Sequence, residues 1–353
     1  MRVADLGENE LIQRLSSLSK HAGGSVGVGN CEHLILGPGD DAAAYQADAG
    51  IFLATTDTAV EGVHFTRESI LWRDLGWKVM ACNLSDIAAM GGIPLHALVT
   101  LGLPMDTEIN DIDELYAGMI ESSNLFSFTI AGGDVVHADK LFISIALIGH
   151  SKGTLLMRSK AEVGDLLAVT GHLGSSSAGL RILNQKNDKF ASDTQTSLLT
   201  QRGSGFTTIS PKARDFLITA HQRPTPRLSD GKTLLKYGVK AAMDISDGLL
   251  LDLTKMMRSS GKMARIDSWK VPIHPHTVRT FPADALRMSL SGGEDYHLLF
   301  SAPPKVMKQA LTSIPQATVI GAVVDGPPGH ISVIDKQNNA LSLDYLGWDH
   351  FRS

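Results

Sequence analysis

The sequence predicts an α/β or α+β protein with two domains, residues 1–150 and 151–353. Three observations support this class. The chain has 353 residues, of which 43% are hydrophobic and 20% charged, an ordinary globular composition with room for two domains. Strand and helix patterns alternate through the first 150 residues. The segment "KLFISIALIGH" (140–150) is apolar at both sets of alternating positions, which is typical of a strand in a covered sheet.

The elements of the first half follow from hydrophobic periodicity. Helix patterns cover 8–20, 73–92 and 110–126, and strand patterns cover 33–37, 50–57, 96–104, 128–134 and 140–150. Asp74 is a candidate N-cap of the second helix, which Gly91, Gly92 and Pro94 end. The strands at 33–37 and 50–57 are expected to be short and buried, and 128–134 to be a strand that ends in a Gly-Gly-Asp turn.

The second half continues the same alternation. Strand patterns cover 164–171, 240–244, 296–302 and 317–324, and helix patterns cover 211–222 and 248–258. A Gly/Ser-rich turn at 171–177 precedes a short helix, and Gly261 closes the helix at 248–258. The polar segment 184–210 is weakly periodic, so we expect a surface insertion there.

The composition and net charge of the chain limit the kinds of binding partner and the cellular location that we expect. The net charge of -5 and the pI near 6.2 show no basic excess, so we expect a small-molecule partner and neither nucleic acid nor a membrane surface. Two cysteines cannot form a disulfide framework, and the acidic start lacks the pattern of a signal peptide. No apolar run reaches the length of a membrane span. These features predict a protein of the cytoplasm.

Three familiar motifs fail on inspection. Gly231-Lys232-Thr233 resembles the end of a P-loop, but Pro226 stands where that loop needs its first glycine. "GPGDDA" (37–42) fits a dinucleotide fingerprint without room for the helix that should follow it. "GSSSAG" (174–179) has Ala178 in place of the last glycine of a nucleophile elbow, so serine hydrolysis is disfavoured.

Acidic residues follow apolar strands or interrupt apolar helices at several places: Asp40, Asp41, Asp57, Asp86, Asp134, Asp244 and Asp247. A single Asp after a strand is usually a turn or capping residue. Several together could supply oxygen ligands to hard cations. Asp244 and Asp247 have no Lys or Arg immediately beside them in an apolar run, and we expect a metal ion to meet them there.

Asp86 is the most informative of these acids. In its helix it shares a row with Cys82 and Met90, and we expect this row to face inward. A buried Asp needs a metal or several hydrogen-bond donors, and Asn83 and Ser85 could be those donors instead of a metal. Gly132-Gly133 before Asp134 and Ser246 at the expected start of a helix would suit phosphate, although such residues are also common in turns and caps.

With these residues placed, the sequence resembles the thiamine-monophosphate kinase family, within the superfamily of aminoimidazole-ribonucleotide synthetase-like ATP-binding proteins. The resemblance spans nearly the whole chain and rests on "GPGDDAA", "TTDTAVEGVHF", "NLSDIAAMGGIP", "AGGD", "RPTPR", "DISDGLLLDL", "SGGEDYHLLF" and "GWDHF". It implies two domains with mixed sheets covered by helices. The first would supply metal and nucleotide acids and the dimer contact, and the second would complete the ATP, magnesium and substrate site.

The resemblance also implies an activity, namely direct transfer of the γ-phosphoryl group of ATP to thiamine phosphate with several magnesium ions, in a homodimer. The matching magnesium positions are Asp40, Thr55, Thr56, Asp57, Asp86, Asp134, Asp244 and Asp247. The matching ATP positions are Tyr116, Gly133, Asp134, Arg158 and Ser246. The matching substrate positions are His64, Glu294 and Trp348, and a carboxylate and an indole suit a thiazolium cation. No residue matches a covalent nucleophile.

Purely structural roles are an alternative for the three residues assigned to the substrate. Glu294 could cap a turn, His64 could be a satisfied core histidine, and Trp348 could be a packing anchor. The threonines usual after "AGGD" are replaced by "VVHADK". The nearest competing function is that of another ATP-dependent enzyme of the superfamily. A selenophosphate synthetase would need a reactive Cys with a Lys near the start of its chain. A hydrogenase-maturation protein would need a Cys at the end of its chain. The same residues could also belong to a nucleotide-binding sensor or to a two-metal phosphohydrolase.

Overall fold

The computed structural model describes residues 14–15, 17–18, 34–36, 44–45, 50–187, 209–341 and 347. They form two compact units, one of residues 1–156 and 225–236 and one of residues 157–224 and 237–353. This division differs from domains at 1–150 and 151–353 because helix α7, Leu228–Lys236, packs with the first unit. Gly231 allows this packing, since a Cβ there would lie 2.1 Å from the carbonyl oxygen of Ala88.

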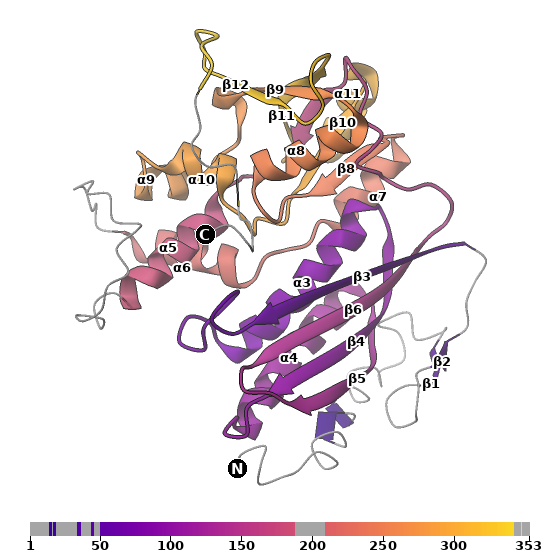
Figure 1. The fold of residues 1–353 in the computed structure, drawn as a ribbon, viewed down its shortest axis with the longest axis vertical. Coiled ribbons are helices and arrows are strands. Elements are labelled where there is room, and N and C mark those ends of the chain that lie inside the picture. The colour runs from indigo at the N-terminus through magenta and orange to yellow at the C-terminus, as the bar shows by residue number, and fades with distance from the viewer. Residues whose placement is uncertain are drawn as a thin grey trace. The chain divides into compact units, whose positions relative to one another are not determined.

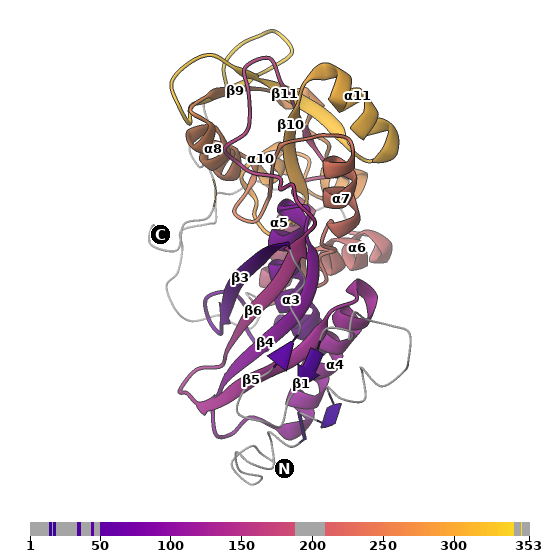
Figure 2. The same cartoon turned by 90° about the vertical axis from the view of Figure 1, so that its right-hand side faces the viewer.

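The first unit is a four-stranded mixed sheet with two long helices on one face (Figure 1). Its other elements in chain order are β1 (Leu34–Leu36), β2 (Ala44–Tyr45), β3 (Ile51–Val60), α3 (Trp72–Ala89), β4 (Ile93–Leu103), α4 (Ile109–Phe126), β5 (Thr129–His137) and β6 (Phe142–Ser151). The sheet order is β3-β6-β4-β5, with only β4 and β5 parallel, and β1 pairs with β2 separately. Figure 2 shows α3 and α4 along the same side of the sheet.

Alternation along β6 explains why only one face is covered. Ile143, Ile145 and Leu147 are fully buried, whereas the residues between them are half-buried. The sheet is therefore packed against helices on one face and open on the other. The strand predicted at 50–57 is longer than expected, and in β3 only Leu53 is buried, because β3 is an edge strand.

The second unit is a six-stranded mixed sheet of order β12-β9-β11-β7-β10-β8. Its strands are β7 (Leu166–Val169), β8 (Ala241–Asp244), β9 (Met263–Asp267), β10 (Leu298–Ala302), β11 (Thr318–Val324) and β12 (Ile331–Ile334). Its helices are α5 (Ser175–Asn187), α6 (Pro211–Gln222), α8 (Leu249–Ser260), the short 3-10 helix η2 (Ser268–Lys270), α9 (Pro275–Thr280), α10 (Ala285–Ser291) and α11 (Pro304–Ser313). Sequence patterns missed β9, β12, α7, α9, α10 and α11, most of which are shorter than eight residues.

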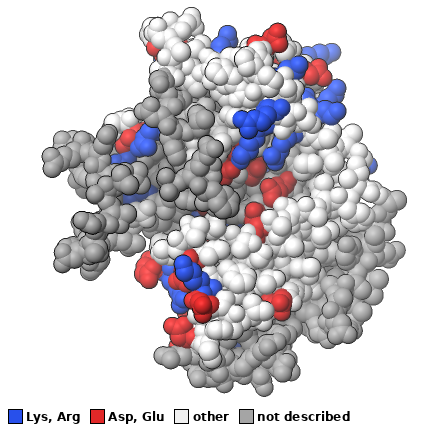
Figure 3. Space-filling view, in the orientation of Figure 1, with Lys and Arg blue, Asp and Glu red and all other residues white. Residues whose placement is uncertain are grey.

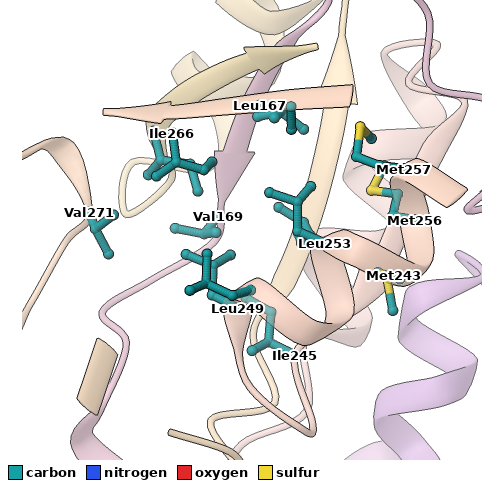
Figure 4. Packing of buried hydrophobic residues seen from close by; sticks show 14 of the residues in the cluster. Leu167, Val169, Met243, Ile245, Leu249, Leu253, Met256, Met257, Ile266 and Val271 are labelled. Carbon is teal, nitrogen blue, oxygen red and sulfur yellow. The ribbon is translucent and has the colours of Figure 1, made fainter. Parts of the chain in front are cut away.

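The core of the second unit lies between α8 and the sheet. Figure 4 shows Leu249, Leu253 and Met256 of α8 directed toward strand residues such as Leu167 and Ile266. All five are fully buried. Since burial of each such side chain contributes about 1.5–3 kcal/mol, this core fixes α8 and the loop that precedes it.

The predicted helix ends agree with the structure for one helix and differ from it for another. The helix predicted at 211–222 is confirmed as α6, with Ser210 as its N-cap. The expected N-cap at Asp74 is wrong: α3 begins after Leu71, and Asp74 lies in its first turn. There its charge still favours the positive end of the helix dipole.

Candidate functional site

One group of predicted metal residues lies where α3 crosses β3. Thr55 Oγ1 donates a hydrogen bond of 2.5 Å to Asp86 Oδ2. Asp57 is two residues further along β3, so it projects from the same sheet face as Thr55. The structure thus brings the hydroxyl of Thr55 and the carboxylates of Asp57 and Asp86 to the α3 side of one edge strand.

The expectation that the row of Asp86 faces inward holds only in part, because Asp86 meets Thr55 of β3 but the row is not fully buried. Cys82, Asp86 and Met90 are half-buried, while every residue between them is buried. The row is the accessible seam of a helix that is otherwise packed on nearly all sides. Asn83 does not serve Asp86, since its Nδ2 donates to Val79 O at 3.1 Å. An accessible carboxylate can meet an ion without the cost of full burial.

Thr56 and Asp134 project from the opposite, open face. Asp134 pairs with Thr100, which pairs with Ser144, and Thr58 Oγ1 donates to Ser144 Oγ at 2.9 Å. Asp134 therefore lies on the far edge strand and the other face from Asp57. The predicted turn at Gly132–Asp134 is wrong, because these residues lie inside β5. A Cβ on Gly133 would be 1.8 Å from Val99 O, so the close pairing of β4 and β5 requires glycine.

The segment after β3 places His64. Its Nδ1 accepts a hydrogen bond of 3.0 Å from Val60 N, so Nε2 carries the proton in the neutral ring. Arg67 holds Glu61 of the same segment by two hydrogen bonds, at 2.7 and 2.9 Å. Tyr116, on α4, is only 5% exposed, and burial raises the pKa of its phenol. Of these two predicted site residues, His64 is the more accessible.

In the second unit, a cation does meet one of the two Asp residues that prompted the metal hypothesis. Asp244 is buried at the end of β8. Asp247 accepts a hydrogen bond from Lys255, eight residues later on α8. No Lys or Arg is adjacent to Asp247 in the sequence, but the helix turns Lys255 back over the loop, so the positive group that meets Asp247 in the structure is a side chain. Although partial burial opposes it, the carboxylates of Asp252 and Asp247 raise the pKa of Lys255.

The loop before α8 is held by a residue that the sequence analysis missed. Asp252 Oδ2 accepts hydrogen bonds from the backbone N of Ser246, Asp247 and Gly248, at 3.0, 2.9 and 3.1 Å. Burial raises the pKa of Asp252. The N-cap of α8 is Gly248, so Ser246 lies two residues before the cap, close to the predicted start of this helix, and does not cap it. These amides are occupied, which leaves the hydroxyl of Ser246 as its group for contacting a phosphate.

Glu294 is fixed through both its backbone and its side chain. It has a φ of 65°, in the left-handed region, and its N donates to Ser246 O at 2.7 Å. Its Oε2 lies 3.3 Å from Nδ1 of His221, whose same nitrogen lies 3.0 Å from Ser176 Oγ. His221 is buried at the end of α6, and no sequence signal pointed to it. The loops around Asp247 and Glu294 thus form one hydrogen-bonded unit.

Of the remaining predicted site residues, one is exposed and two lie outside the part of the chain that the structure describes. Arg158 is exposed, and its carbonyl accepts a hydrogen bond of 2.8 Å from Ser260 Oγ. Asp40 and Trp348 lie outside the described residues. Within the described part of the chain, no three His, Cys, Asp or Glu side chains are grouped closely enough to hold a metal by themselves.

Comparison with known proteins relates the whole chain to one family. Residues 39–151 match the N-terminal domain of AIR synthase related proteins, and residues 162–334 match its C-terminal domain. Thiamine-monophosphate kinase of Bacillus subtilis (strain 168) is 33% identical over 324 residues, covering 90% of this chain and 94% of the relative.

Two solved structures agree. The crystal structure of thiamine-monophosphate kinase from Stenotrophomonas maltophilia K279a has a TM-score of 0.74 and 30% identity, covering 91% of this chain and 95% of its own. AaThiL complexed with AMPPCP and TMP has a TM-score of 0.72 and 31% identity, covering 99% of both chains. The fold expectation of two α/β domains with helix-covered mixed sheets is confirmed.

Proposed function

Because this chain belongs to the thiamine-monophosphate kinase family, we propose that it transfers the γ-phosphoryl group of ATP to thiamine phosphate, giving thiamine diphosphate and ADP. The observation that carries this function is the end-to-end match to AaThiL complexed with AMPPCP, an ATP analogue, and TMP. The 30–34% identity of the kinases from several bacteria supports the same substrates.

The oxygen donors of this chain fit magnesium. Mg²⁺ prefers one or two carboxylates together with water and substrate phosphates, and it rarely occupies a cage made entirely of protein. Asp86 beside Thr55 provides such a carboxylate, and the absence of a three-acid group among the described residues is compatible with it. We propose that Asp40, Thr55, Thr56, Asp57, Asp86, Asp134, Asp244 and Asp247 hold magnesium ions. When bound, magnesium neutralises charge on the transferring phosphates.

The other residues position two anionic substrates. The exposed guanidinium of Arg158, the glycine backbone at Gly133 and the hydroxyl of Ser246 would contact ATP, with Tyr116 and Asp134. Glu294 would attract the thiazolium cation, and His64 and Trp348 would contact the same substrate. Transfer in line between two bound substrates needs orientation and charge neutralisation, so we propose direct transfer without a phosphoenzyme.

We also propose a homodimer and a cytoplasmic location. The open face of the four-stranded sheet exposes Phe52, Leu98 and Val136, at 43%, 40% and 40%. The described part of this face shows few charged side chains in Figure 3, although the exposed Asp134 lies on it. A sheet face that exposes apolar side chains in this way suits burial against a second copy. Among the described residues, no helix has the length and apolar character to cross a bilayer.

The first test follows thiamine diphosphate by chromatography after mixing protein, ATP, magnesium and thiamine phosphate. We expect product from the monophosphate, and none from unphosphorylated thiamine. Phosphate release without an acceptor would instead identify a phosphohydrolase. ATP binding without turnover would favour a nucleotide-binding sensor.

The second test addresses the metal set. We expect Asp86→Asn to lower kcat by at least about 100-fold with the fold retained. The substitution removes a carboxylate that would bind the magnesium ions that stabilise the transition state. Asp74→Asn, on the same helix, is the matched control and should retain activity. Unchanged turnover in Asp86→Asn would remove that residue from the set.

A further inference from the structure

Lys255 on α8 lies between two carboxylates with different tasks. Its Nζ donates a hydrogen bond of 2.8 Å to Asp252 Oδ1 and a second to Asp247 Oδ2. The Asp252 side chain is 0% exposed, whereas those of Lys255 and Asp247 are 36% and 30% exposed. The ammonium group thus joins a buried structural acid to an accessible acid of the proposed metal set.

Asp252 and Lys255 together define the position of Asp247. One oxygen of Asp252 is taken by three successive amides of the loop 246–248, and the other accepts from Lys255. A carboxylate with donors on both oxygens is well satisfied, so Asp252 needs no metal. Its geometry shapes the loop and keeps Lys255 within reach of Asp247.

The consequence for metal binding is electrostatic. Lys255 places a single positive charge on the carboxylate that a divalent cation would use. A metal at Asp247 must separate this ion pair and come close to the ammonium group, and both effects weaken binding. The half-exposed ammonium can leave Asp247 while it keeps its hydrogen bond to the buried Asp252.

We propose that Lys255 is the built-in counter-ion of Asp247. Its ammonium group pairs with the Asp247 carboxylate until magnesium displaces it. The inference rests on the proposed function, because it takes Asp247 as a metal ligand. The ion pair between Lys255 and Asp247 makes metal binding at this loop favourable chiefly when nucleotide phosphates arrive with the metal and supply compensating negative charge. Lys255 is a positioning residue, and it sets the affinity for magnesium.

The test is calorimetric titration of the full chain with magnesium in the presence of AMPPCP. We expect Lys255→Met to bind magnesium at least about fivefold more tightly than the natural chain, since the competing charge is gone. Lys255→Arg retains that charge and should stay within about twofold. Arg258→Met removes an exposed charge from the same helix and should leave the affinity unchanged.

A gain of affinity separates this role from a structural one, because a damaged loop would bind magnesium more weakly. If Lys255→Met does not fold, Lys255→Gln removes the charge but keeps a donor for Asp252. A folded Met or Gln variant with unchanged or weaker magnesium affinity overturns the proposal.

Asp247→Asn separates this inference from the proposed function. Magnesium affinity that is unchanged in Asp247→Asn would remove Asp247 from the metal set, and the role of Lys255 would fall with it. Weaker binding in Asp247→Asn, with no gain in the Lys255 variants, would overturn the counter-ion role alone.

Discussion

At the scale of single residues, the carboxyl group of Asp295 has a strongly raised pKa and lies outside the proposed metal set. Its two oxygens accept hydrogen bonds from the backbone N of Gly174, at 2.6 Å, and Ser176, at 3.1 Å, at the start of α5. Burial nevertheless outweighs these bonds and raises the pKa of Asp295 to about 7.

This pKa predicts how stability changes with pH. Between about pH 4 and pH 7 the folded chain keeps a proton on Asp295 that the unfolded chain has released, so the folded state binds more protons. The contribution of this group to the free energy of unfolding therefore falls as pH rises through that window. We expect the stability of the natural chain relative to Asp295→Asn to decrease from pH 4 to pH 7.

The measurement is urea denaturation of both proteins at a series of pH values. Asp325→Asn changes an exposed carboxyl and serves as the control for the general effect of one charge. Parallel pH profiles for the natural chain and Asp295→Asn would contradict the raised pKa.

At the scale of secondary-structure elements, the contact between α3 and α4 depends on two glycines. A Cβ on Gly76 would lie 1.9 Å from Leu115 O, and a Cβ on Gly118 would lie 1.8 Å from Arg73 O. Each helix thus meets the backbone of the other through a glycine. Because α3 carries Asp86, this contact also fixes a proposed metal ligand.

We expect Gly118→Ala to lower the free energy of unfolding by about 3 kcal/mol, since one of the two helix backbones must move. The measurement is urea denaturation followed by tryptophan fluorescence. Gly132→Ala is the control, because its Cβ would meet nothing closer than 3.5 Å. Equal stability of the two variants would show that α3 and α4 can separate without cost.

At the scale of the whole molecule, the open sheet face predicts assembly. Leu98 lies on β4 in the interior of the sheet and is 40% exposed. In a homodimer that buries this face, an added carboxylate would lose its hydration at a cost of several kcal/mol. We expect Leu98→Asp to convert a dimer into a monomer, as measured by light scattering.

The control for this prediction is Val163→Asp, which changes another exposed apolar residue, at 51% exposure, in the other unit. It should remain a dimer. A natural chain that is monomeric, or a Leu98→Asp variant that stays dimeric, would remove the open face as the interface.

The sequence predicted the long elements well, because their signals are local. The apolar spacing in α4, β6 and α6 depends on neighbours in the chain. Short elements such as β12 and α9 carry too few periods to be recognised. The family, and with it the substrates, also followed from sequence, because its motifs are contiguous.

The surroundings of the candidate site residues required the tertiary structure. Lys255 contacts Asp247 because α8 turns back over its own loop, and i+8 spacing beside Asp252 was the signal that could have shown it. Nothing local could place His221 beside Glu294, since α6 and the loop before β10 are far apart in the chain.

The sequence by itself determined the element types, the oxygen-donor chemistry of the acids and the family. These properties depend on side-chain identity and short-range periodicity, which the chain carries in every conformation. Only the tertiary structure decided that Asp134 and Asp57 project from opposite faces of one sheet, and that the row of Asp86 is accessible. Strand order and helix orientation come from packing between distant segments, so no local pattern contains them.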